Sequence, residues 1–150
     1  MSLKQYLDFM QTRKDRRPES EYLDKFVARL PADKKARFRQ LGLQYDREYS
    51  ILRHDIAKEL GLNQSQVDSM IVKLESLFVE GYGKADQFWL NLDRGGSDQA
   101  AYAARGKLLA EYDAKERQSI LDALTPAQRA KWRQMIGKDV PEIQPSRGFG

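Results

Sequence analysis

The sequence predicts an all-α protein, an antiparallel helical bundle or hairpin of five to six helices with a short extended C-terminal tail. Apolar residues recur at steps of three and four along most of the chain, which is the period of one face of an α-helix. Glycine, proline and capping residues fall between these runs, where helices begin and end. The composition, 41% hydrophobic and 32% charged, supplies a core and excludes an intrinsically disordered chain.

The length of 150 residues suits one domain with a single modest core. We expect one helical domain over 1–150, with basic N-terminal helices in 1–30, a helical core in 31–138 and a tail in 139–150. The chain has no cysteine, which excludes disulfides and thiolate chemistry. It contains no apolar run of the roughly 18 residues that span a bilayer and no signal-peptide core, so we expect no transmembrane segment.

Positive charge is concentrated at the N-terminal end. The first 40 residues carry 11 basic and 6 acidic side chains, a charge of +5, while the other 110 carry 15 basic and 16 acidic, a charge of −1. Two short amphipathic helices are expected here, the second capped by Ser20. The apolar face of the first comprises Leu3, Tyr6, Leu7 and Met10. The apolar face of the second comprises Tyr22, Leu23, Phe26, Val27 and Leu30.

The strongest periodic signal follows Pro31, which is favoured at the start of a helix. Steps of 3, 4, 4, 3, 4 and 4 separate seven apolar residues, the alternation of a coiled-coil seam. These residues are Phe38, Leu41, Tyr45, Tyr49, Leu52, Ile56 and Leu60. They predict one unbroken helix from Ala32 to Gly61, whose apolar face packs on the next helix. A strand near 49–52 would instead favour a winged fold.

The second long helix is predicted to fold back on the first. Gly61 can end the first helix in the left-handed conformation, and Asn63 can cap the second. The apolar positions of the second again step by 4, 3 and 4: Val67, Ile71, Leu74 and Phe78. We expect Gly81 and Gly83 to fray or kink this helix. An apolar face then resumes at Phe88, Trp89 and Leu92.

The last third of the chain is predicted to hold two more helices. A loop at 93–97 precedes an alanine-rich helix, which Ser97 or Asp98 can cap. The apolar residues of this helix are Leu108, Leu109, Tyr112, Ile120 and Leu121. A short helix from Thr125 to Ile136 follows, and Gly137 can end it.

A helix-start pattern recurs along the chain. Segment 30–41 agrees in residue type at most positions with segment 124–135, which indicates a degenerate internal repeat. In the second copy Thr125 caps the helix, Pro126 supplies a suitable backbone angle, and Gln128 reaches back to complete a capping box. The first copy has a proline in place of the capping residue.

Leu124-Thr125-Pro126-Ala127-Gln128 is an intact LTxxQ motif, and Leu62-Asn63-Gln64-Ser65-Gln66 is a near copy with asparagine as the cap. These segments resemble the motif of the Spy/CpxP-like helical proteins of the bacterial periplasm, over a pattern that extends from Leu30 to Gly137. The matched positions are Leu62, Asn63, Gln66, Leu124, Thr125 and Gln128. An extra helical segment around 99–120 departs from the family pattern.

The resemblance implies a non-enzymatic chaperone or adaptor of the envelope stress response. Such a protein would bind unfolded or partner proteins through a basic, partly apolar helical surface, and members of the family are often dimeric. The resemblance also implies a periplasmic or exported location, although the chain carries no export signal. Without the resemblance we expect a cytoplasmic protein.

A second hypothesis is a winged helix-turn-helix DNA-binding transcriptional regulator. Ala57, Gly61, Val67 and Met70 have the spacing of that motif, with a small residue for close helix approach and a glycine for the turn. The base-facing residues would be Gln64, Ser65, Gln66 and Ser69. The two strands of the wing would be 78–82 and 88–92. The candidate recognition helix carries few cations, however, and phosphate binding needs several.

Catalytic chemistry has little support. His54 is the one histidine, so neither a Ser-His-Asp system nor a histidine metal cluster can be assembled. Asp55 and Glu59 stand four residues apart, which we attribute to a solvated helix face. Gly81-Tyr82-Gly83 and Gly95-Gly96 lack the lysine and hydroxyl of a phosphate loop. We therefore expect no enzyme activity, no cofactor and no bound metal.

Two basic segments form the candidate binding surface, one around Phe38 and one around Trp132. Their cations are Arg29, Lys34, Lys35, Arg37, Arg39, Arg129, Lys131 and Arg133. If the two segments lie side by side, they form one cationic patch that can attract acidic chains or lipid headgroups. If they lie on opposite sides, there is no such patch.

Overall fold

The computed structural model describes residues 25–92, 98–138 and 140, and every assigned element in these ranges is helical. Residues 25–29 form a short helical segment. The other elements are α3 (Ala32–Asp46), the 3₁₀ helix η1 (Arg47–Leu52), α4 (His54–Leu60), α5 (Gln64–Leu92), α6 (Asp98–Asp122) and α7 (Pro126–Ile136). The predicted all-α class is confirmed. The first predicted helix, the loop at 93–97 and the extended part of the tail lie outside the described residues.

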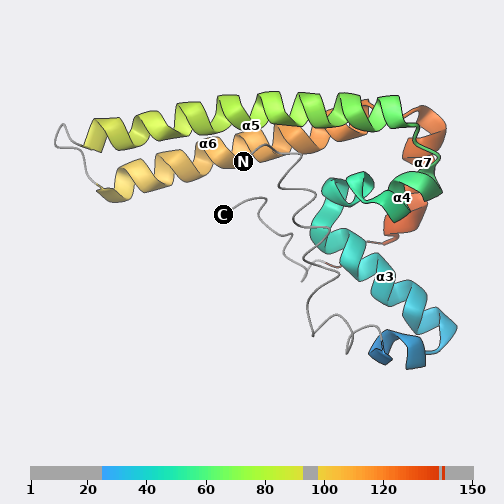
Figure 1. Ribbon diagram of the computed structural model, residues 1–150. Coiled ribbons are helices and arrows are strands. Elements are labelled where there is room, and N and C mark those ends of the chain that lie inside the picture. Colours follow the sequence, from blue (N-terminus) through green and yellow to red (C-terminus); the bar gives the residue numbers. More distant parts are fainter. Residues whose placement is uncertain (1–24, 93–97, 139, 141–150) are drawn as a thin grey trace.

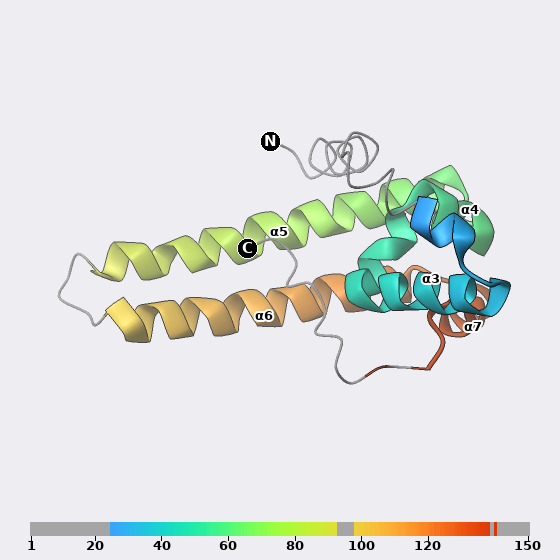
Figure 2. The same ribbon diagram turned by 90° about the horizontal axis from the view of Figure 1, so that it is seen from below.

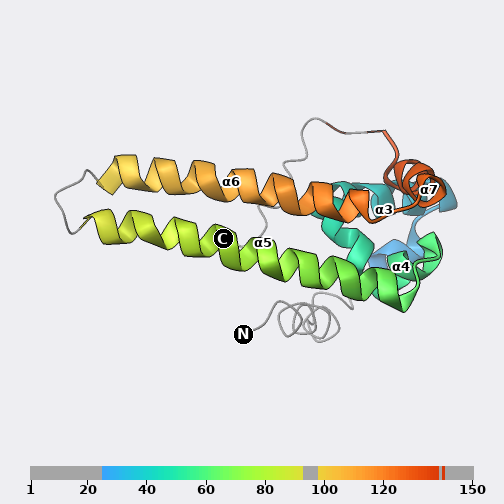
Figure 3. The same ribbon diagram turned by 90° about the horizontal axis from the view of Figure 1, so that it is seen from above.

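Helices α5 and α6 form a long antiparallel hairpin, and α3, η1, α4 and α7 gather at one end of it (Figure 1). We call this end the helical cluster. Views from below and above show that the far half of the hairpin has no other described helix beside it (Figures 2 and 3). Each helix of the hairpin therefore leaves a long face uncovered by the described elements.

The predicted unbroken helix from Ala32 to Gly61 is wrong. The backbone turns at Arg47, with φ 50° and ψ −137°, and becomes extended at Arg53, so η1 and α4 take new directions. Arg47 is the only non-glycine residue with a positive φ in the described part of the chain. This conformation is sterically costly, and it folds Ile51 and Ile56, both fully buried, into the core.

The core lies where the helical cluster meets the hairpin. Its buried apolar side chains come from every element of the cluster and from both hairpin helices; they include Leu43, Ile51, Ile56, Leu60, Met70, Leu74, Ile120 and Trp132. The break changes which face of α3 is buried. Leu43 is 1% exposed, whereas the predicted seam residues Phe38 and Tyr45 are 36% and 52% exposed.

Helix α5 continues through Gly81 and Gly83 instead of fraying or kinking. Gly81 is buried against α6, where a Cβ atom would lie 2.7 Å from Cγ of Tyr112. The Tyr112 hydroxyl donates to Glu80 at 2.8 Å and accepts from Lys84 at 2.8 Å, which closes the contact around the glycine. The missing side chain at Gly81 thus allows the Tyr112 ring to pack on the α5 backbone.

We predict that Gly81→Ala lowers the free energy of unfolding by about 1–3 kcal/mol, because the new methyl group overlaps the buried Tyr112 ring. Gly83→Ala is the matched control, since its Cβ meets nothing within 4 Å. This control is expected to gain about 0.5–1 kcal/mol from helix propensity. Urea unfolding followed by circular dichroism measures both. Equal effects of the two substitutions would contradict the close packing.

A polar cluster joins η1 to α6. The Tyr49 hydroxyl lies 2.6 Å from Glu116 Oε2 and 3.1 Å from Asp113 Oδ1, and Arg117 donates to Asp113 at 2.8 Å. Burial raises the pKa of Glu116 because it disfavours the carboxylate, and the Asp113 charge raises it further. The hydrogen bond from Tyr49 acts in the opposite direction but does not cancel this effect.

Glu116 is therefore expected to make stability depend on pH. The folded protein holds this proton more tightly than the unfolded chain, so the stabilisation is present at acidic pH. It is lost as the pH rises from the ordinary glutamate value of about 4.5 through the raised pKa. Unfolding free energies between pH 4 and 7 should decline less steeply in Glu116→Gln than in the unmodified protein. Glu111→Gln, at an exposed site on α6, is the control.

Tyr49→Phe tests the same cluster independently. It removes the hydroxyl that lies between the two carboxylates, and the loss of a buried hydrogen bond should cost about 1–3 kcal/mol at neutral pH. Thermal unfolding measures this. An unchanged stability would show that the cluster does not hold η1 to α6.

Candidate functional site

The intact LTxxQ motif forms the predicted capping box at the start of α7. The Gln128 backbone N–H donates to the Thr125 hydroxyl at 3.3 Å, and the Thr125 N–H donates to Gln128 Oε1 at 2.9 Å. Gly137 ends the helix with φ 67°. Pro31, at the corresponding position before α3, makes no side-chain cap.

The near copy of the motif makes the same local structure at the start of α5. The Gln66 N–H donates to Asn63 Oδ1 at 2.8 Å, and the Asn63 N–H donates to Gln66 Oε1 at 3.2 Å. Gly61 ends α4 with φ 70°, as the sequence predicts. The two motifs therefore differ in the capping residue but not in the reciprocal bonds.

The structure also brings the two motif glutamines into contact. Gln66 Nε2 donates to Gln128 Oε1 at 3.1 Å, and Gln128 Nε2 donates to the Gly61 carbonyl at 3.2 Å. The ends of α4 and the starts of α5 and α7 are thus joined by one small amide network. Nothing in the spacing of the motifs indicates this contact, because 62 residues separate the two side chains.

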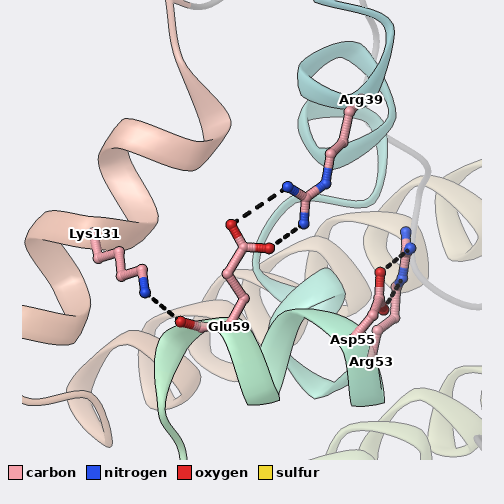
Figure 4. Close-up of polar contacts among 5 residues, drawn as sticks. All are labelled: Arg39, Arg53, Asp55, Glu59 and Lys131. Atoms are coloured by element: carbon pink, nitrogen blue, oxygen red, sulfur yellow. Dashed lines mark hydrogen bonds and ion pairs between the residues drawn. The ribbon is translucent and has the colours of Figure 1, made fainter. Parts of the chain in front are cut away.

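The two predicted basic segments lie at the same end of the molecule, because α3 packs beside α7 (Figure 1). Arg37 crosses between them and donates from both terminal nitrogens to the Lys138 carbonyl at 3.3 Å. Arg39 and Lys131 converge on Glu59 from either side. Arg39 binds its carboxylate, and Lys131 binds its backbone carbonyl (Figure 4).

These contacts reduce the charge that the patch presents. The hydrogen bond from Arg39 lowers the pKa of Glu59, so this carboxylate stays ionised and offsets one cation. Asp55 is paired with Arg53 in the same region (Figure 4). The cations that remain exposed in the two segments include Arg29, Lys34, Lys35 and Arg133. Trp132 is only 3% exposed and belongs to the core, so Phe38 is the aromatic side chain at this surface.

The structure also shows a line of exposed apolar side chains on α5 that the sequence pattern did not predict. Val72, Val79 and Leu90 are 66%, 70% and 68% exposed. Their separations of 7 and 11 residues place them on one face of an α-helix, since both distances are close to whole numbers of turns. We call these three residues the apolar stripe. Their spacing is consistent with a second apolar face, but the buried face of the same helix has the stronger apolar pattern.

The structure corrects part of the helix-turn-helix hypothesis. The segments expected to form a wing, 78–82 and 88–92, lie within α5 and are helical. The turn itself is present, since the Leu62 N–H donates to the Ala57 carbonyl at 2.9 Å across Gly61. Of the four predicted base-facing residues, Gln64, Ser65 and Ser69 are exposed, whereas Gln66 is engaged in the amide network.

Comparison of the chain with protein-family models, curated proteins and solved structures finds no match. Within residues 25–92 and 98–138, no helix combines the length and apolarity needed to cross a membrane. In the same ranges, histidine and acidic side chains form no group of three or more that could hold a metal ion.

We predict that Gln66 and Gln128 stabilise the fold cooperatively. Each single substitution to alanine should cost about 1 kcal/mol, because it removes half of a capping box. The double variant should cost less than the sum by about 0.5 kcal/mol or more, because the contact between the two amides is lost only once. Gln134→Ala, exposed on α7, is the control. Strict additivity in urea unfolding would contradict the network.

Proposed function

We propose that this protein is a non-enzymatic, Spy/CpxP-like chaperone or adaptor that binds unfolded or partner proteins through a basic, partly apolar helical surface. The observation that carries the proposal is the contact between the two motif glutamines. Both motif copies form reciprocal caps, and their glutamines meet. This is the arrangement expected if the two segments are related structural units rather than unrelated helix starts.

The surface chemistry suits loose binding of unfolded chains. The apolar stripe can cover exposed apolar segments of a client, at a gain of about 25 cal/mol for each Å² removed from water. The cations of α3 and α7 can attract acidic segments over the screening distance of physiological salt, about 8 Å. The apolar residues are separated along the helix by polar ones such as Ser76 and Asp86. Such a discontinuous surface favours weak, exchangeable contacts.

The proposal carries further expectations from the resemblance. It places the mature chain in the periplasm or in another exported location. It also includes a homodimer, since the uncovered faces of α5 and α6 leave room for a second copy. On this proposal, neither client binding nor dimerisation needs a cofactor or a nucleotide.

A helix-turn-helix DNA-binding regulator is the second candidate. It is supported by the turn between α4 and α5, in which Ala57 and Met70 are buried at the packing positions of that motif. Two observations weaken this candidate. The segments expected to form the wing are helical, and Gln66, at the start of the recognition helix, is bonded within the amide network. Binding to duplex DNA that weakens steeply with salt would favour this candidate.

We predict that the protein suppresses client aggregation without ATP, measured by light scattering of a reduced or heat-unfolded client. Val72→Ser/Val79→Ser should raise the half-suppressing concentration about fivefold, because about 1 kcal/mol of apolar contact is lost. The same change should leave the free energy of unfolding within about 0.5 kcal/mol, since both sites are exposed. Ser65→Ala/Ser76→Ala is the matched control. Failure of the unmodified protein to suppress aggregation would contradict the proposal.

A further inference from the structure

A hollow of about 240 Å³ lies where α3 and η1 meet the ends of α6 and α7. Three arginines line it: Arg47, Arg129 and Arg133. Three apolar side chains also line it: Leu121, Trp132 and Ile136. Arg47 and Arg133 are exposed whereas Trp132 is buried, so the charged groups lie nearer to solvent than the indole. We call this hollow the arginine pocket.

The arginines of the pocket differ from three others in the described part of the chain. Arg39, Arg53 and Arg117 each pair with a carboxylate, whereas no ion pair engages the three pocket arginines within residues 25–92 and 98–138. Arg129 donates from one terminal nitrogen to the Leu124 carbonyl at 3.3 Å, and its buried Nε has no hydrogen-bond partner. The pocket therefore holds cationic donors that form no ion pair with the described carboxylates.

One acidic residue offsets part of this positive charge. Glu48 also lines the pocket, and its carboxylate forms an ion pair with Arg117 at 3.8 Å. Three arginines and one glutamate leave an excess of about two positive charges at the pocket. This balance favours an anion, and the apolar side chains of the lining favour one that is attached to an apolar body.

The backbone at Arg47 supports a binding role. Its positive φ is unfavourable for an L-residue with a long side chain, and such strained positions cluster at ligand sites. The turn carries the Arg47 side chain to the same pocket as Arg129 and Arg133, which stand four residues apart on one face of α7.

We propose that the arginine pocket binds a carboxylate carried on an apolar or aromatic body. The planar fork of arginine matches a carboxylate in two parallel hydrogen bonds. The apolar body would lie against Trp132, Leu121 and Ile136. An apolar cavity of about 150 Å³ holds a benzene ring, so this pocket can take a ring together with its carboxylate. Two sources share this chemistry, a free organic acid and the C-terminal carboxylate of a peptide.

This binding activity does not depend on the chaperone proposal. Trp89→Phe leaves Trp132 as the single tryptophan of the chain, so its fluorescence reports on the pocket. Titration with phenylacetate represents the free acid, and N-acetylphenylalanine represents the peptide end. We expect a saturable change with at least one of them and none with the neutral N-acetylphenylalaninamide. The acid that binds more tightly identifies the source.

Substitutions separate specific binding from general attraction. Arg129→Gln and Arg133→Gln should each weaken binding about tenfold, because a charge-assisted hydrogen bond is lost. Arg53→Gln, which removes a cation outside the pocket, is the control and should bind as before. If Trp89→Phe impairs folding, the indole N–H resonances of the unmodified protein provide the same readout.

Three results would overturn the proposal. The amide could bind as tightly as the acid, which would show that the carboxylate is not recognised. Inorganic phosphate could bind as tightly as either acid, which would show a general anion site without an apolar contribution. Retention of full affinity in both arginine variants would place the ligand elsewhere.

Discussion

The turn of the backbone at Arg47 is the constraint on which the rest of the arrangement depends. A helix continued straight from α3 would carry Ile51 and Ile56 away from the hairpin. The turn instead places both in the core with Ile120 and Trp132. Full burial of one such side chain is worth about 1.5–3 kcal/mol, whereas an unfavourable φ costs about 1–3 kcal/mol. The free energy gained by burying two isoleucines exceeds the cost of the strained backbone, so the helix ends at Arg47 and the predicted coiled-coil seam does not form.

Hydrophobic burial holds the helical cluster together but does not fix its orientation, because it is not directional. Directional contacts do this at two points. The amides of Gln66 and Gln128 join three helix termini, and the missing side chain of Gly81 lets Tyr112 set the separation of α5 and α6. Losing either contact should therefore disturb the geometry of the molecule more than its gross helix content.

The two proposed binding activities occupy different parts of the molecule. The apolar stripe lies along α5, whereas the arginine pocket lies within the helical cluster. Of the eight cations predicted from the sequence, Arg39 and Lys131 bind Glu59, and Arg37 binds the Lys138 carbonyl, so these side chains bind oxygen atoms of the protein itself. The charge that remains for ligands is smaller than the count of basic residues implies, and part of it lines the partly apolar arginine pocket. A count of basic residues in the sequence thus overestimates the positive charge that the surface presents.

The sequence by itself determined the all-α class, the helix starts at Asn63 and Thr125 and the stops at Gly61 and Gly137, because caps and left-handed glycines are interactions within a few residues. Only the tertiary structure decided the break at Arg47, the helical path through Gly81 and the meeting of Arg47 with Arg129 and Arg133. Apolar periodicity predicts which face of a helix is hydrophobic, but it does not predict which distant element will pack on that face. Long-range packing then decides where a helix ends and which side chains share a pocket.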